Sequence, residues 1–333
     1  MHHKFWRDTR IGIIVLILCF GLIVTSAKSQ VFLSMGGGSR GGTFDTFGLG
    51  VSDILWRSID GFNLSLVKSA GSGENLRRIQ AGEMDMGVAF AGDVFLSYNG
   101  EGDFAEDGPY DEVRVIGFLY SAVSQLVTLE GTGVTSVEDL AGKTVAVGES
   151  GSGTQLSVER LLTTLGLYDE IDPVLVAGLD ASEELKAQQV QAYHGLYGVP
   201  NATVTDTSST GEAVILNTYD AAEAAGFFEA YPFYSKYVIP AGTFSGIDED
   251  VETFRDAGLW VVAADTDEEL VYQMTKAVYD QVGVYFMQEP TNGVAGEMGP
   301  DTALVGVQTP LHPGAARYWE EVGVTIPQAA QPR

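Results

Sequence analysis

The chain has 333 residues, of which 45% are apolar and 19% are charged, a composition typical of a globular protein large enough for two domains. Its formal net charge of −27 at pH 7 argues against binding to nucleic acid or to anionic lipid headgroups, because both are polyanions. If the chain binds an anion, short-range hydrogen-bond donors have to overcome this unfavourable long-range field.

The first 27 residues are typical of a secretory signal peptide. Lys4, Arg7 and Arg10 give a positive start, residues 11–24 form an unbroken apolar run, and small residues follow up to Ala27. The run has 14 residues, fewer than the roughly 20 that a membrane-spanning helix needs. We therefore expect a signal peptide over residues 1–27 and a periplasmic mature chain. An uncleaved N-terminal anchor is the alternative.

Cysteine and histidine are too few for the usual disulfide and zinc chemistry. Cys19 is the only cysteine and lies within the apolar run, and of four histidines only His194 and His312 follow residue 27. A zinc site made of His and Cys is therefore excluded, and no loop has the alternating Asp/Asn pattern of a calcium loop. We expect no metal and no cofactor.

Beyond the signal peptide, apolar strands alternate with amphipathic helices. The pattern predicts strands at residues 31–33, 63–68, 86–90, 113–119, 125–129, 144–147, 173–176, 193–199, 213–216, 237–239 and 259–263. It predicts helices at residues 44–54, 76–82, 93–98, 157–165, 182–189, 267–282 and 313–321, and a brief helix after a capping box at Ser136. This order is typical of an α/β protein with largely parallel sheets.

Three Ser- and Gly-rich turns, at residues 35–43, 69–75 and 148–154, each lead from a predicted strand toward a predicted helix. Glycine lets the backbone approach a ligand closely, and the unpaired N–H groups at a helix start favour negative charge. The turns therefore predict one anion-binding cleft built from several loops. Their candidate ligand-binding residues are Ser39, Arg40, Gly41, Gly42, Thr43, Ser72, Gly73, Ser150, Ser152, Gly153 and Thr154.

The charge of Arg40 among these glycines has two interpretations. Its guanidinium could hold a carboxylate in a bidentate pair, or it could be a solvated side chain or a partner of Asp45. Asp45, if it faces the cleft, could accept an ammonium group.

The first turn also fits two catalytic or cofactor motifs. Gly36-x-Gly38-x-x-Gly41 has the spacing of a dinucleotide fingerprint, but Lys68-Ser69 stands where an acid for the ribose is needed. Gly37-x-Ser39-x-Gly41 matches a nucleophile elbow, so an exported serine hydrolase using Ser39 is an alternative. That enzyme would require His194 or His312 beside Ser39.

Further motifs occur in order along the chain. They include Ala70-Gly71-Ser72-Gly73-Glu74-Asn75-Leu76-Arg77, Leu140-Ala141-Gly142-Lys143, Tyr231-Pro232-Phe233-Tyr234, Ile239-Pro240-Ala241-Gly242-Thr243 and Pro310-Leu311-His312-Pro313-Gly314. Together with residues 36–50 and 147–154, these segments resemble the TAXI family of TRAP-transporter solute-binding proteins. The resemblance spans nearly the whole mature chain.

The resemblance implies a type II periplasmic-binding-protein fold, with two α/β lobes and a ligand cleft between them. The lobes are expected at residues 28–118 with 240–333 and at residues 119–239, with Tyr197 and Asn201 lining the second. It implies a monomeric receptor, not an enzyme, for a small carboxylate such as glutamate, a dicarboxylate or an oxoacid. The partner would be a TRAP-type membrane permease, through which alone the chain would contact the membrane. A ligand sensor for a membrane kinase is another alternative.

This sequence departs from the family pattern at Arg40, at Phe44-Asp45 and at residues 188–194. These departures concern the expected cleft, so they bear on the ligand more than on the fold.

Overall fold

The structure is a computed structural model that describes residues 30–39, 42–209, 211–285 and 296–333. The predicted signal peptide and two candidate site residues, Arg40 and Gly41, lie outside the described residues. All elements below belong to the unit Val31–Arg333.

Ten strands form one sheet in the order β2-β1-β3-β10-β4-β7-β5-β6, with β8 paired to β4 and β9 to β10. β1 (Val31–Gly36) pairs in parallel with β2 (Phe62–Val67) and β3 (Met86–Phe90). β5 (Thr144–Ala146) pairs in parallel with β6 (Asp172–Val174) and β7 (Ala192–Tyr197). The sheet therefore contains two parallel sets, in agreement with the predicted α/β class.

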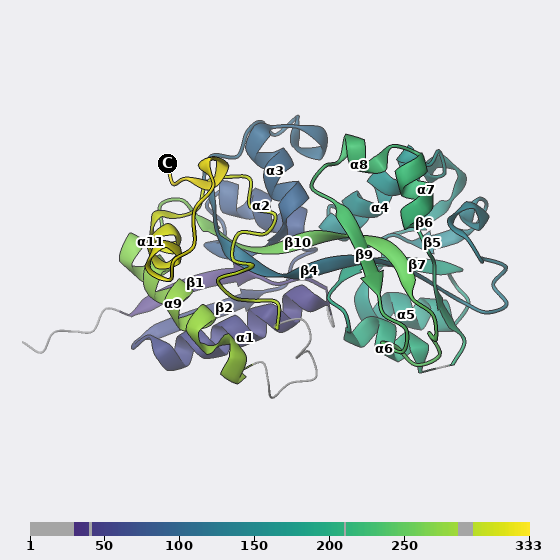
Figure 1. The fold of residues 1–333 in the computed structure, drawn as a ribbon, viewed down its shortest axis with the longest axis horizontal. Helices are drawn as coiled ribbons and strands as arrows, with labels where there is room; N and C mark the ends of the chain where they lie inside the picture. The colour runs from purple at the N-terminus through teal and green to yellow at the C-terminus, as the bar shows by residue number, and fades with distance from the viewer. Residues whose placement is uncertain (1–29, 40–41, 210, 286–295) are drawn as a thin grey trace, which may run out of the picture. The chain divides into compact units, whose positions relative to one another are not determined.

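Two long antiparallel strands join the parallel sets. β4 (Val113–Leu129) and β10 (Val251–Ala263) pair with each other over most of the length of β10, and Figure 1 shows them running side by side. β10 also borders β3, and β4 also borders β7. The short strands β8 (Ala213–Ile215) and β9 (Ser235–Ile239) complete the sheet.

β4 replaces the two strands predicted at residues 113–119 and 125–129. Ser121 and Ser124 interrupt the apolar pattern there, yet both are buried. β10 covers one edge of β4 along this stretch, so the ladder continues through the polar residues. The prediction of two strands was wrong.

A helix follows each parallel strand. In the first set these are α1 (Thr43–Ser58), α2 (Ser72–Gln80) and α3 (Ala91–Asn99); in the second they are α4 (Gly153–Thr164), α5 (Gly178–Lys186) and α6 (Ala202–Ser208). The remaining helices are α7 (Tyr219–Ala224), α8 (Phe227–Ala230), α9 (Glu268–Tyr285), α11 (Pro313–Glu321) and the 3-10 turns η1 (Gly102–Phe104), η2 (Val137–Leu140), η3 (Tyr168–Glu170) and η5 (Gln328–Ala330). The capping box predicted at Ser136 is confirmed, whereas α6, α7 and α8 were not predicted.

We call β1–β3 with α1–α3, η1, α9 and α11 the first lobe, and β5–β8 with α4–α7 and η3 the second lobe. The largest apolar cluster is centred in the first lobe and includes Trp260 and Trp319. Two smaller clusters lie in the second lobe around Tyr193 and Leu162. Phe244 belongs to the same apolar cluster as Tyr193. The lobe boundary at residue 240 stays a prediction.

Candidate functional site

Three helix starts meet at one cavity. The N-caps of α1, α2 and α4 are Gly42, Gly71 and Ser152. All three helices follow parallel strands, so they begin at the carboxyl ends of those strands, where α/β sheets bind their ligands. The space between the walls of the cavity measures about 320 Å³, part of which is open to solvent. Its walls are Gly38, Ser39, Gly42, Thr43, Phe44, Ala70, Gly71, Ser72, Phe90, Ser152, Gly153, Thr154, Leu196 and Tyr197.

The helix starts supply backbone donors. The first-turn N–H groups of a helix have no acceptor within the helix, and the N-caps of α1 and α2 make no side-chain capping bond. These N–H groups carry the partial positive charge of the helix dipole. Convergence of three such ends in one small cavity therefore favours an anion.

Three hydroxyls in the cavity wall accept backbone hydrogen bonds, which orients them. Thr43 Oγ1 accepts a hydrogen bond from the Gly198 N–H at 2.9 Å. Ser72 Oγ accepts from the Phe90 N–H at 3.0 Å, and Ser152 Oγ accepts from the Gln155 N–H at 3.0 Å. The Thr43 hydroxyl also hydrogen-bonds to the Tyr120 side chain. The oxygens of Ser72 and Ser152 each already accept a hydrogen bond, so these two hydroxyls can donate to a ligand.

Aromatic rings close part of the cavity. Phe44 and Phe90 lie with their ring centroids 4.8 Å apart. The Tyr197 hydroxyl accepts a hydrogen bond from the Gly178 N–H at 3.1 Å. Burial raises the pKa of Tyr197 to about 12, so the phenol stays neutral. Such apolar walls reduce the local dielectric and strengthen the donor interactions with a charged ligand.

Glycine at Gly153 and Gly73 allows the two lobes to approach closely at this point. A Cβ at Gly153 would lie 2.4 Å from Phe90 Cδ2 and 2.5 Å from Asp93 Oδ2, both in the first lobe. A Cβ at Gly73 would lie 2.3 Å from the Gly151 carbonyl oxygen of the second lobe. The cavity therefore lies where the lobes are in direct contact.

The structure brings most of the predicted site residues together. Ser39, Gly42, Thr43, Ser72, Ser152, Gly153, Thr154 and Tyr197 line the cavity. Ser150 is exposed, and Gly73 packs against the Gly151 backbone without lining the cavity.

Asn201 also lies outside the cavity lining. It caps α6 by accepting from the Val204 N–H, and its amide donates to Gln125 Oε1 and to the Gly198 carbonyl. Its polar atoms are thus used within the fold.

Apart from Tyr197, the predicted ligand-binding residues do not include the apolar part of the lining. Phe90 and Leu196 stand at the carboxyl ends of β3 and β7, and Phe44 follows the first Gly-rich turn. Their positions at strand ends were a usable signal, because side chains at that edge of the sheet face a common crevice.

A second, wider groove adjoins the cavity and shares Gly38 and Ser39 with it. It measures about 1010 Å³, part of which is open to solvent. Asp45, Lys68 and Glu149 line it. Asp45 therefore lies in the wall of this groove and not in the cavity where the helix starts meet.

Neither histidine beyond residue 27 is bonded to Ser39. His194 Nε2 lies 3.0 Å from Ser124 Oγ, and burial lowers the pKa of His194 to about 3. His312 Nδ1 accepts from the Gly314 N–H as the cap of α11, and its Nε2 lies 2.9 Å from the Thr266 carbonyl oxygen. Ser39 thus lacks the general base that the hydrolase alternative needs among these two histidines.

The described residues contain no group of three or more His, Cys, Asp or Glu side chains placed to hold a metal ion. Within the same residues, no helix is both long enough and apolar enough to cross a bilayer.

The sequence profile of the NMT1-like family matches residues 35–323. A structure of a protein from Bordetella bronchiseptica has a TM-score of 0.55 and 15% identity over 90% of this chain and 86% of that one. A structure described as a periplasmic transporter has a TM-score of 0.50 and 12% identity over 78% of this chain and 85% of that one.

The aliphatic sulphonate binding protein SsuA from Escherichia coli is a more distant match, with a TM-score of 0.45 and 14% identity over 88% of this chain and 91% of that one. Identities this low bear on the fold alone. The predicted α/β fold of periplasmic binding proteins is confirmed.

Proposed function

Because this chain belongs to the NMT1-like family, we propose that it is an extracytoplasmic solute receptor of the TAXI class. It binds a small carboxylate, such as glutamate, another amino acid, a dicarboxylate or an oxoacid, between its two lobes. It then delivers this ligand to a TRAP-type permease for ion-coupled uptake. It acts in the periplasm as a monomer after removal of residues 1–27, and it is not an enzyme.

The convergence of α1, α2 and α4 on one cavity is the observation that supports this proposal most strongly. First-turn N–H groups and the hydroxyls of Ser72 and Ser152 give the cavity an excess of donors over acceptors. A carboxylate offers only acceptors and about four lone-pair sites. The cavity therefore complements a carboxylate at short range, despite the net charge of −27.

The lobe boundaries follow the same proposal, with residues 28–118 and 240–333 in one lobe and 119–239 in the other. Closure of the lobes would remove water from the ligand and create a joint surface for the permease. Arg40 would add a positive charge to the site. Asp45, in the wall of the adjoining groove, would accept the ammonium group of an amino acid.

Isothermal titration calorimetry against a panel of amino acids, dicarboxylates, oxoacids and sulfonates tests the proposal. We expect at least one carboxylate to bind with a Kd below about 100 μM, or roughly −5.5 kcal/mol. Binding of sulfonates alone, or of no anion at all, would contradict it.

A pair of serine variants tests where the carboxylate binds. Ser72→Ala removes a buried hydroxyl of the cavity, whereas Ser150→Ala removes an exposed hydroxyl outside it. We expect the first to weaken binding by about 1–2 kcal/mol, because a hydrogen bond to a charged group is lost. The second should leave the affinity unchanged. Equal effects would place the ligand elsewhere.

The permease partner needs its own assay. Proteoliposomes that contain a TRAP-type permease should take up the ligand only when this receptor is added. Uptake that is independent of the receptor would favour the sensor alternative. Labelling of Ser39 by a fluorophosphonate would favour the hydrolase alternative.

A further inference from the structure

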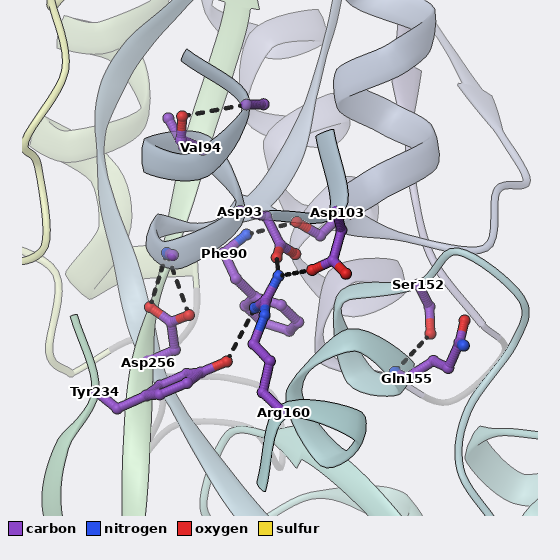
Figure 2. A network of polar contacts seen from close by, with 12 residues as sticks. Phe90, Asp93, Val94, Asp103, Ser152, Gln155, Arg160, Tyr234 and Asp256 are labelled. Carbon is purple, nitrogen blue, oxygen red and sulfur yellow. Dashed lines mark hydrogen bonds and ion pairs between the residues drawn. The ribbon is translucent and has the colours of Figure 1, made fainter. Parts of the chain in front are cut away.

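A buried ionic network joins the two lobes, and Figure 2 shows its side chains. Arg160 of α4 donates to Asp93 Oδ1 of α3 at 2.9 Å and to Asp103 Oδ2 of η1 at 2.6 Å. Its other terminal nitrogen donates to the Tyr234 hydroxyl at 3.1 Å. Arg160 and Asp93 are only 6% and 1% exposed. The guanidinium of the second lobe is therefore enclosed by acids of the first.

The network is connected to the cavity through the helices that carry it. Gly153 begins α4 and lines the cavity, and Arg160 lies seven residues further along the same helix. Phe90 lines the cavity as the N-cap of α3, and Asp93 lies in the first turn of that helix. A shift of α4 relative to α3 would therefore change the network and the cavity together.

Acids outnumber bases in this network. Asp256 of β10 accepts from the N–H groups of Gly92 and Ala257. Burial, and then the nearby Asp93, raise the pKa of Asp256 to about 8, so it is largely protonated at neutral pH. Burial works to lower the pKa of Arg160, but Tyr234 and the carboxylates of Asp93 and Asp103 raise it above its ordinary value. The network thus holds one guanidinium against two carboxylates.

Three ion pairs elsewhere in the protein each lie within a single lobe. Among the described residues, Lys276–Glu321 and Arg78–Glu74 lie within the first lobe, and Lys186–Asp206 lies within the second. The two pairs of Arg160 are the ones that join α4 to the first lobe. Because a buried charge without its partner is strongly unfavourable, the separated lobes must hydrate these groups again.

We propose that Arg160 is a positioning residue for the binding cavity. By pairing with Asp93 and Asp103, it holds the start of α4 against the starts of α2 and α3 and favours the closed arrangement of the lobes before any ligand binds. This inference uses the proposed function only in taking the cavity as the binding site. The closure itself can be measured without a ligand.

The test is a distance measurement between the lobes of the full chain. The background carries Cys19→Ser, and spin labels are attached at Glu83→Cys and Asp169→Cys, two exposed positions in the first and second lobes. Arg160→Met should produce a second population with a longer distance between the labels. This population should be several-fold larger than any long-distance population of the parent protein. Lys186→Met, which breaks a pair inside the second lobe, should leave the distance distribution unchanged.

Two milder substitutions test the same contacts in case Arg160→Met does not fold. Asp103→Asn changes a partner that is 34% exposed and should give a smaller shift toward the long distance. Arg160→Lys keeps the charge and should restore part of the short-distance population. If both Arg160→Met and Asp103→Asn fold and show the parent distance distribution, the inference is refuted.

Binding of L-glutamate provides a second readout. If the parent protein binds this probe, Arg160→Met should bind it at least tenfold more weakly, and Lys186→Met should bind it normally. If the parent does not bind L-glutamate, the choice of ligand in the proposed function is challenged. The distance measurement still decides the role of Arg160 in either case.

Discussion

Gly153→Ala isolates the contact between the lobes at the cavity. Gly153 begins α4, and its backbone φ is not in the left-handed region, so the conformation itself accepts alanine. Alanine within a helix is favoured over glycine by about 0.5–1 kcal/mol. Helix propensity alone therefore predicts that Gly153→Ala makes the protein more stable.

Steric clashes with the first lobe oppose this gain in stability. The new Cβ would lie 2.4 Å from Phe90 Cδ2, 2.5 Å from Asp93 Oδ2 and 2.8 Å from Ser72 Cβ. Overpacking of this kind costs about 1–3 kcal/mol. All three neighbours belong to the first lobe, so opening of the lobes relieves the clash. We therefore expect closure to weaken by roughly 5- to 150-fold, since 1.4 kcal/mol corresponds to a factor of ten.

Two measurements separate these contributions. Calorimetry with the ligand found in the panel should show an affinity loss of about 1–3 kcal/mol, while urea unfolding without ligand should change by no more than about 1 kcal/mol. Gly299→Ala is the control, because a Cβ there has no neighbour within 4 Å. An affinity equal to that of the parent would refute the reasoning. A large loss of unfolding stability would show that the clash is not relieved by opening.

Two further predictions follow from the same region. Gly73→Ala should also weaken binding with little change in urea unfolding, because its Cβ would lie 2.3 Å from the Gly151 carbonyl oxygen of the other lobe; normal affinity would show that the lobes meet differently when ligand binds. The second prediction concerns the pH dependence of stability that comes from Asp256. Burial and the nearby Asp93 raise the pKa of Asp256 to about 8. The folded state therefore keeps a proton that the unfolded chain releases near pH 4. The stability from this proton is complete at low pH and is lost as the pH rises toward 8, so between about pH 6.5 and pH 8 the parent should lose up to about 1.4 kcal/mol per pH unit. Urea unfolding of Asp256→Asn should have a flatter pH dependence, and equal slopes would contradict the assignment.

The sequence predicts much of the fold and of the cavity because those parts depend on local signals. Gly42 and Gly71 precede helices that bury apolar stripes, and Ser152 is a recognisable N-cap. Periodicity places these starts after strands, and parallel pairing then brings them to one edge of the sheet.

The missed features depend on tertiary contacts. β4 runs unbroken through Ser121 because β10 pairs with it there, which a period-two pattern does not reveal. The polar atoms of Asn201 turn to Gln125 and to the backbone of α6, a role that its loop position in the sequence does not distinguish from ligand binding. The pairing of Arg160 with Asp93 joins residues 67 positions apart, and no local pattern signals it.

The long strands β4 and β10 have a mechanical consequence for the protein. They are hydrogen-bonded to each other between the lobes, and their register shifts at Gly258/Leu259 and at Trp260/Val261. Irregularities of this kind increase the local twist of a ribbon. Rotation of one lobe relative to the other would therefore twist this hydrogen-bonded ladder without breaking it. The motion would not require a loose linker. The amides of this ladder should exchange slowly with deuterium in both arrangements, because the ladder stays hydrogen-bonded while the lobes rotate.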